Sequence, residues 1–329
     1  MKNRFSPRAI WLTLVLLATL NFQLSTFAQG SLTPPGAPAP TMKTLAQIEP
    51  RTPISSVPFT IIAPGAYYLT TNLTVTSGTA ITVATNGVTL DLNGFTIAST
   101  APNAAGAGIV INTYLRNLAI LNGFIQGGVT NNVSGVYSGS GFGDGISGYP
   151  QSARVSGVSV SGCLYNGIYL GSGDATVVES CTVRTVGSIG IIASTIKASL
   201  AKDCGWIAIL GVQVTDCRGE STGSGGGDGL YATTAQNCNG SSSSGYGLYA
   251  TNAQNCNGSS SSGTGLNATT AQNCYGSSSS GTGLYTLMAL ICYGYSNGGT
   301  GLNAYIANSC YGYSITGTQQ LISFKYNMP

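Results

Sequence analysis

The 329-residue sequence contains no histidine, and only 6% of its residues are charged. Histidine is the side chain that most often transfers protons near neutral pH, so its absence removes the histidine-containing motifs of many hydrolases. The CxxC spacing of zinc sites is missing as well, and we expect no metal site of that kind. From Gly229 to Phe324 there is no charged residue of either sign. Since this segment offers only tyrosine and cysteine as titratable groups, we do not expect it to contain a reaction centre.

Long apolar runs are confined to the N-terminus, where the pattern is that of an export signal. The apolar run from Ala9 to Leu20 follows three cations, and STFAQG supplies small residues for cleavage near Ala28. The run is shorter than the ~20 residues that a bilayer requires, so we expect no membrane span in the mature chain. Residues 1–28 are therefore predicted to be a signal peptide of a secreted or cell-surface protein, periplasmic or extracellular.

Removal of this signal balances the charge of the chain. Nine cations then face nine carboxylates. A net charge near zero gives no electrostatic footprint for nucleic acid, so a nucleic-acid partner is not expected. The next segment, residues 29–45, contains SLTPPGAPAP and is predicted to be an extended Pro-rich linker.

Cysteine recurs with a regular period in the second half of the chain. GLYATTAQNCNGSSSSGY begins at Gly229 and is followed by two nearly identical 18-residue segments. Such units are too short for two helices and a turn, so each is predicted to be one coil of short strands. Stacked coils lie ~4.8 Å apart, which places like residues over one another. Nine units share the pattern [VA]-x-[GSDN]-C, apart from Ile291 before one cysteine, and predict one internal column: Cys163, Cys181, Cys204, Cys217, Cys238, Cys256, Cys274, Cys292 and Cys310.

Two states of these cysteines are compatible with export. Secreted proteins usually form disulfides. However, the number of cysteines is odd, and in-register Cβ atoms would lie ~4.8 Å apart instead of the ~3.8 Å that a disulfide prefers. We favour stacked, buried thiols, with the asparagines at the bends hydrogen-bonded along the stack.

Other segments are interpreted by comparison with the cysteine units. Phe95 and Phe124, each after LNG, are predicted to fill the cysteine column. The 13-residue interval before Cys217 predicts irregularity over residues 206–214, and residues 127–152 are predicted to leave the stack as a loop. The serine tetrads are interpreted as solvated turns. They begin at Ser241, Ser259 and Ser277.

NGVTLDLNGFTI and GIYLGSGDATVVESCTVRTVGSIGI resemble coils of the right-handed parallel β-helix proteins, the pectate-lyase-like superfamily with its exported bacterial members of unknown function. The resemblance covers residues 46–318. It implies an all-β fold, a single-stranded right-handed parallel β-helix (β-solenoid) of roughly twelve coils with an N-terminal cap. Residues 319–329 are expected to be a C-terminal cap. A left-handed β-helix also suits 18-residue coils but needs an aliphatic residue at every sixth position, where Leu230 is followed by Gln236 and Ser242.

An enzymatic interpretation depends on the charged region 174–228. The column pattern predicts that Asp203 and Asp216 lie one coil apart at the same bend, beside Lys202 and Arg218. In a lyase-like arrangement, which the resemblance implies, such carboxylates would hold calcium while arginine abstracts a proton. The alternative is a charged ladder neutralised by neighbouring cations. No family motif is matched residue by residue, so we favour the ladder and keep a polysaccharide lyase, or another carbohydrate-active enzyme, as the second hypothesis.

A binding interpretation depends on tyrosines at coil spacing. Rows of aromatic side chains could contact sugar rings, or could simply stack on one another. One row follows the cysteines and the other follows Gly-Leu: Tyr275, Tyr293 and Tyr311, and Tyr231, Tyr249 and Tyr285. Threonines at the same spacing could order ice, but threonine is also a favoured strand former.

The sequence therefore predicts an exported, non-catalytic β-helix scaffold or surface protein without a cofactor, whose partner is a polysaccharide or cell-envelope glycan.

Overall fold

The computed structural model describes residues 48–132, 134–173 and 175–328. The chain divides into two units, Met1–Pro50 and Arg51–Pro329, and the strands found among the described residues belong to the second. The predicted signal peptide, the Pro-rich linker and Asp174 lie outside the described residues. Within the described part, no helix has the length and apolar character needed to cross a membrane.

The strands are short and follow one another with few residues between them. The first nine are β1 (Thr52–Ile54), β2 (Phe59–Ile61), β3 (Gly65–Leu69), β4 (Leu73–Val75), β5 (Ile81–Val83), β6 (Val88–Asp91), β7 (Thr96–Ser99), β8 (Ala107–Ile111) and β9 (Leu118–Gln126). The next eleven are β10 (Gly128–Asn131), β11 (Tyr137–Ser140), β12 (Asp144–Gly148), β13 (Ser152–Cys163), β14 (Ile168–Tyr169), β15 (Ala175–Glu179), β16 (Thr182–Val186), β17 (Ile191–Lys197), β18 (Leu200–Cys204), β19 (Ile209–Thr215) and β20 (Arg218–Ser221).

The remaining strands alternate strictly between seven and four residues. They are β21 (Leu230–Gln236), β22 (Asn239–Ser242), β23 (Leu248–Gln254), β24 (Asn257–Ser260), β25 (Leu266–Gln272), β26 (Tyr275–Ser278), β27 (Leu284–Leu290), β28 (Tyr293–Ser296), β29 (Leu302–Asn308), β30 (Tyr311–Ser314) and β31 (Gln320–Tyr326).

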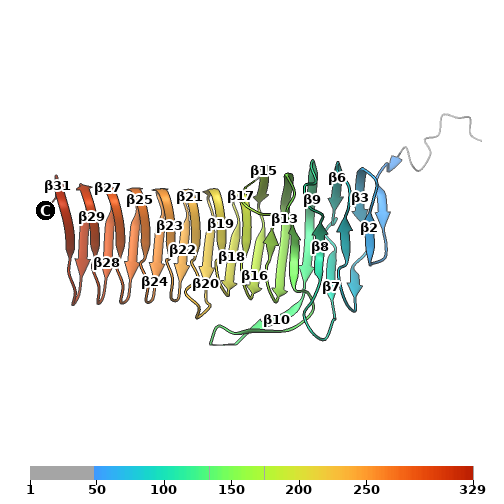
Figure 1. The fold of residues 1–329 in the computed structure, drawn as a ribbon, viewed down its shortest axis with the longest axis horizontal. Helices are drawn as coiled ribbons and strands as arrows, with labels where there is room; N and C mark the ends of the chain where they lie inside the picture. Colours follow the sequence, from blue (N-terminus) through green and yellow to red (C-terminus); the bar gives the residue numbers. More distant parts are fainter. Residues whose placement is uncertain (1–47, 133, 174, 329) are drawn as a thin grey trace, which may run out of the picture. The chain divides into compact units, whose positions relative to one another are not determined.

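Each strand of the stack pairs in parallel with the equivalent strand of the next coil. β21 pairs with β23, β23 with β25 and β25 with β27, while β22, β24, β26 and β28 form a second series. The coils therefore follow chain order along the unit, from β2 and β3 in blue to β31 in red (Figure 1). This arrangement confirms the predicted all-β parallel β-helix, with a number of coils close to that expected.

The burial of each seven-residue strand explains its sequence. In LYATTAQ, Leu230, Ala232 and Ala235 are buried, whereas the other side chains are exposed. In the pairing of β21 with β23, Ala232 pairs with Ala250 and Thr234 with Asn252, while Thr233 between them is not paired. The side chains of Thr233 and Thr234 therefore both point outward. The strand changes face at this threonine, which lets one short segment cover two sides of a narrow core.

The cysteines form two columns instead of the predicted one. Cys217, Cys238, Cys256, Cys274, Cys292 and Cys310 follow one another at the start of the short strands, in line with Ser199 and Cys181. Cys163 and Cys204 lie at the far end of the short strand, in line with Val186 and Ser221. The coil between Cys181 and Cys217 is therefore marked by Ser199, and the prediction that Cys204 marks a coil was wrong.

This correction removes the predicted irregularity over residues 206–214. β19 lies there and pairs with β17 and β21 in regular register. A register shift occurs instead between Ala201 and Cys204. The predicted loop over residues 127–152 is partly wrong, because only β10 and β11 leave the stack as an antiparallel hairpin, whereas β12 pairs with β8 and β14 inside it (Figure 1).

The two phenylalanines differ from each other. Phe95 stands in line with Gly123 and Cys181 and packs, half-buried, against the core. Phe124 is one position later in that register and is 50% exposed, so its predicted internal place was wrong. Gly123 takes the internal position because a Cβ there would lie only 2.4 Å from the Cβ of Leu92.

The second serine of each tetrad is buried, so the prediction of solvated turns was only partly right. Ser242 Oγ donates a hydrogen bond to Gly227 O and accepts one from Gly245 N, and Ser260 and Ser278 make equivalent bonds. Buried backbone groups at turns need such partners. These serines therefore fasten the long turn of one coil to the turn of the preceding coil.

The C-terminal segment 319–329, expected to form a cap, adds one more strand. β31 pairs with β29 and places Gln320 and Lys325 in line with Leu302 and Ala307. Lys325 Nζ donates a hydrogen bond to Gln320 Oε1 over 3.2 Å. Polar side chains thus stand at the last core positions, where the apolar columns meet solvent.

Candidate functional site

Two residues join the long and the short strand of each coil, and the first of them, which we call the bend residue, defines the first element of the site. The bend residues have positive φ, between 45° and 55°. Asparagine and aspartate tolerate this left-handed conformation better than most residues, which explains why they precede the cysteines. The bend residues are Ser180, Ala198, Asp216, Asn237, Asn255, Asn273, Ile291 and Ser309.

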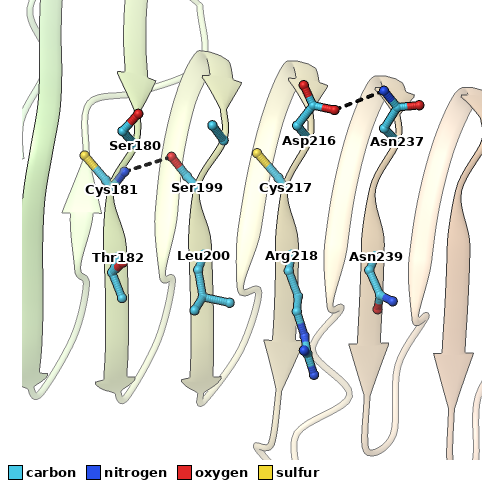
Figure 2. Close-up of a pocket in the computed structure, with 11 residues that line it drawn as sticks. Ser180, Cys181, Thr182, Ser199, Leu200, Asp216, Cys217, Arg218, Asn237 and Asn239 are labelled. Carbon is cyan, nitrogen blue, oxygen red and sulfur yellow. Dashed lines mark hydrogen bonds between the residues drawn. The ribbon is translucent and has the colours of Figure 1, made fainter.

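These bends form one side of a shallow groove that follows the coils, which we call the bend groove. The cysteine column and Ser199 form its floor, and the first residues of the short strands form its other side (Figure 2). The groove has two hollows of about 670 and 530 Å³ on successive coils. The second side consists of Thr182, Leu200, Arg218, Asn239, Asn257, Tyr275, Tyr293 and Tyr311.

A ladder of amides lines the bend side of the groove. Asn273 Nδ2 donates to Asn255 Oδ1 (3.3 Å), Asn255 Nδ2 donates to Asn237 Oδ1 (3.2 Å), and Asn237 Nδ2 donates to Asp216 Oδ1 (3.0 Å; Figure 2). All these amide hydrogens point toward the N-terminal coils, so the carboxylate of Asp216 accepts at the positive end of the aligned dipoles. Ile291 has no amide and ends the ladder.

Three predicted tyrosines line the opposite side of the groove. The rings of Tyr275 and Tyr293 stack with centroids 5.4 Å apart and planes 8° apart, and those of Tyr293 and Tyr311 with 5.5 Å and 12°. The faces of Tyr293 are therefore covered by its neighbours, and its edge and hydroxyl point outward. Burial and the neighbouring tyrosines raise the pKa of Tyr293, so its hydroxyl stays protonated at neutral pH.

The other predicted tyrosine row lies on the outer face of the long strands. Tyr231 and Tyr249 stack with centroids 4.7 Å apart. Tyr285 has the same register but is separated from Tyr249 by Asn267. The six tyrosines thus divide between two faces, and only the row of Tyr275, Tyr293 and Tyr311 borders the bend groove.

Asp203 lies at the docking point of the hairpin, not at the bends. Its Oδ1 accepts hydrogen bonds from Asn131 Nδ2 (2.6 Å), Tyr137 OH (2.9 Å) and Thr222 Oγ1 (2.8 Å), and its Oδ2 accepts one from Thr185 Oγ1 (2.8 Å). Burial alone would raise the pKa of Asp203, but these four bonds lower it below its ordinary value. The carboxylate therefore holds the β10–β11 hairpin against the stack.

The four predicted catalytic residues are not brought together. Asp216 is a bend residue, whereas Asp203 precedes Cys204 at the far end of its short strand, so their predicted common bend was wrong. Lys202 Nζ lies 3.4 Å from Glu220 Oε2, and an Arg218 guanidinium nitrogen lies 3.8 Å from the same oxygen. Two cations thus share one carboxylate on a partly exposed surface.

The cysteines of the groove floor are free and buried. Cys256 Sγ lies 3.1 Å from Gln254 O and 3.4 Å from Ala235 O, within reach of weak S–H donation to either. Burial raises the pKa of Cys217 to about 12, so its thiol is protonated and a poor nucleophile at neutral pH. No group of three or more metal-ligating side chains is found among the described residues.

The partners of Asp203 could not be found from the repeat pattern. Asn131 and Tyr137 belong to the hairpin, which has no counterpart in other coils, and Thr222 lies in a turn that is three residues longer than in the 18-residue coils. The one signal in the sequence was the inserted segment of the β10–β11 hairpin, because a polar segment that leaves a repeat needs polar contacts that hold it to the repeat.

No family model matches the chain, and no significant match was found among curated proteins or solved structures.

Proposed function

We propose that this protein is an exported, non-catalytic β-helix scaffold that binds extracellular polysaccharide along the bend groove. The row of Tyr275, Tyr293 and Tyr311, which continues the column of Asn239 and Asn257 on the second side of the groove, carries this proposal. The amide ladder faces this column as far as Asn273, which shares a coil with Tyr275. Successive coils lie ~4.8 Å apart, so a linear sugar polymer lying along the groove would meet a carboxamide or a phenol hydroxyl at every coil.

The chemistry of the groove supports a neutral ligand. Its C-terminal part lies within the segment from Gly229 to Phe324, which has no charged residue. Phenol hydroxyls and carboxamides both donate and accept hydrogen bonds, as sugar hydroxyls do. Since the faces of Tyr293 are covered by its neighbours, we expect sugars to contact ring edges and hydroxyls rather than stack on this ring.

The contacts of three carboxylates in the charged region support a role without catalysis. Asp203 accepts four hydrogen bonds, Asp216 holds the end of the amide ladder, and Glu220 lies between two cations. General acid–base catalysis needs a group that exchanges protons near the working pH. The lyase hypothesis would need Asp203 and Asp216 at one centre, and they belong to different parts of the coil.

A panel of neutral and uronic-acid polysaccharides tests the proposal. We expect binding to a neutral polymer without depolymerisation, and we expect Tyr293→Ala to weaken it about tenfold, as loss of a central aromatic contact does. Tyr249→Ala is the matched control because it removes a stacked tyrosine from another face. Equal weakening by both variants would contradict the groove as the site. A calcium-dependent rise in ultraviolet absorbance with uronic-acid polymers would instead support the lyase hypothesis.

A further inference from the structure

The outer face of the long strands changes character at β27. In β21, β23 and β25, the outward positions after the first tyrosine or asparagine carry threonine, asparagine and glutamine. In β27, the same positions carry Leu287, Met288 and Leu290, and the first two are both 51% exposed. The last three long strands together expose an apolar patch, which we call the terminal patch: Tyr285, Leu287, Met288, Leu290, Tyr305, Leu321, Phe324 and Tyr326.

The terminal patch has a ridge between two hollows. Tyr305 and Phe324 contact edge to face, with ring centroids 5.3 Å apart, near the middle of β29 and β31. On one side is a hollow of about 390 Å³ lined by Tyr285, Leu287 and Leu321. On the other side is a hollow of about 290 Å³ lined by Met288, Leu290, Ile306 and Tyr326. Under a two-fold rotation, the ridge of one such face can enter a hollow of another.

We propose that the terminal patch is a dimer interface with a second copy of this chain, the two sheets packing face to face about a two-fold axis. The eight side chains are each about half exposed, which gives roughly 600 Å² per copy if ~150 Å² is taken for a fully exposed side chain. Two copies bury about 1,200 Å², which reaches the lower bound for specific, stable interfaces.

Charge favours a second copy as the occupant. Apart from Tyr326, the residues of the patch lie in the segment from Gly229 to Phe324, which has no charged residue. Lys325 is the one charged residue of the three long strands that carry the patch, so two copies meet with little repulsion. A partner that presents charged groups would find no opposite charges here and would lose solvation without compensation. An uncharged, apolar face with a ridge between two hollows can be complementary to itself, as an isologous interface requires.

The ends of the stack favour association through this face. The N-terminal edge consists of three-residue strands with Pro53 in β1 and Pro58 before β2, and such short, proline-containing edges resist pairing. At the C-terminal edge, Gln320 and Lys325 occupy core positions and discourage end-to-end continuation of the core. The structure therefore favours a closed dimer over a filament. This inference does not depend on the proposed function of the bend groove.

Sedimentation velocity of the exported full-length mature chain tests the interface. We expect a dimer that dissociates on dilution, and we expect its dissociation constant to rise at least 100-fold in the triple variant Leu287→Thr, Met288→Thr, Leu290→Gln. These substitutions restore the residues that β25 carries at the same positions, Thr269, Thr270 and Gln272, so the coil should still form. Tyr249→Ala, on the same face outside the patch, should leave the dimer unchanged.

Circular dichroism of each variant separates loss of association from loss of folding. Tyr305→Thr removes half of the ridge and should weaken the dimer without changing β27, which provides an independent test if the triple variant is unstable. The proposal is overturned by a wild-type chain that stays monomeric at all concentrations, including one that binds lipid vesicles through the patch. A folded triple variant that dimerises as tightly as the wild type would also overturn it.

Discussion

The two halves of the β-helix wind coils of different length around different interiors, since Gly65 pairs with Val88 in the N-terminal half but Leu230 pairs with Leu248 in the C-terminal half. Along one column of the short strands, the core residue becomes progressively smaller toward the C-terminus: Val160, Val183, Ala201, Gly219, Gly240, Gly258, Gly276, Gly294 and Gly312. A column of the long strands changes in the same way: Val178, Ile196, Val214, Ala235, Ala253, Ala271, Ala289 and Ala307. The N-terminal interior is filled by branched side chains, whereas the C-terminal interior is closed by backbone.

This difference shows that the register of the coils does not depend on one kind of core. Each valine replaced by alanine gives up about 1.6 kcal/mol of burial, at ~0.8 kcal/mol for each of two carbon groups. The C-terminal coils compensate with close backbone approach and with the buried serines that join successive turns. We therefore expect the two halves to respond differently to the same substitution, and the following predictions are arranged from the largest effect to the smallest.

Adding one methyl group to a closely packed glycine of the C-terminal half should have the largest effect. A Cβ on Gly247 would lie 2.3 Å from Ser259 N and O and 2.5 Å from Gly265 O, all backbone atoms that cannot rotate away. We expect Gly247→Ala to destabilise the protein by about 3 kcal/mol, the upper range for overpacking. Guanidinium denaturation followed by tyrosine fluorescence measures the change.

The control for this substitution is Gly225→Ala, where a Cβ meets nothing within 4 Å. Ala208 stands at the register of Gly229 and Gly247, which shows that this column accepts a methyl group in one coil, although Gly190 precedes it there. A Gly247→Ala variant as stable as the wild type would mean that the backbones of the C-terminal coils can move apart. It would contradict the conclusion that backbone atoms close the C-terminal interior.

Removing one buried hydroxyl should have an intermediate effect. Ser260→Ala leaves Gly245 O and Gly263 N without their hydrogen-bond partner, so we expect a loss of about 1–3 kcal/mol. Ser221→Ala is the matched control in the same column, because Ser221 Oγ is buried without a hydrogen-bond partner. This variant should be neutral or slightly more stable. Equal losses in the two variants would refute the role of the serines as fasteners between turns.

Acid should act locally and only on the N-terminal half. The pKa of Asp203 is lowered in the folded protein, so its contribution to stability is complete above the ordinary value and is lost as the pH falls through the folded value. The loss should begin below about pH 4, and once the pH has fallen below the lowered pKa of Asp203 we expect the β10–β11 hairpin to detach and to become sensitive to pepsin near Asn132. Asp203→Asn should detach it at neutral pH as well.

The segment from Gly229 to Phe324 provides the internal control for this experiment, because it has no carboxylate to protonate. Hydrogen exchange of β23 and β25 should therefore be the same at the two pH values after correction for the intrinsic rate. Cleavage of these coils before the hairpin would contradict the assignment of Asp203 as the acid-sensitive contact.

Sequence alone was sufficient where residues repeat with the period of the coil. The alternation in LYATTAQ and the left-handed preference of asparagine are local properties, so the strands, bends and amide ladder followed from them. It failed where two positions can hold the same residue type. Cys204 and Cys217 are both buried, yet they lie at opposite ends of the short strand, and Ser199 marks the coil between them. The misplacement of Asp203 followed from that error, because its position was inferred from Cys204.

The three nearly identical segments that begin at Gly229, Gly247 and Gly265 have a consequence for how this chain changes over generations. Each of these coils rests on a neighbour with almost the same side chains at the same heights. Unequal recombination that removes or duplicates 54 bases, at three per residue, would restore every column with no new contact to be optimised. Length is therefore a freely adjustable trait in this half of the molecule, whereas the wider half, with its hairpin anchored from three separate segments, admits no such exchange.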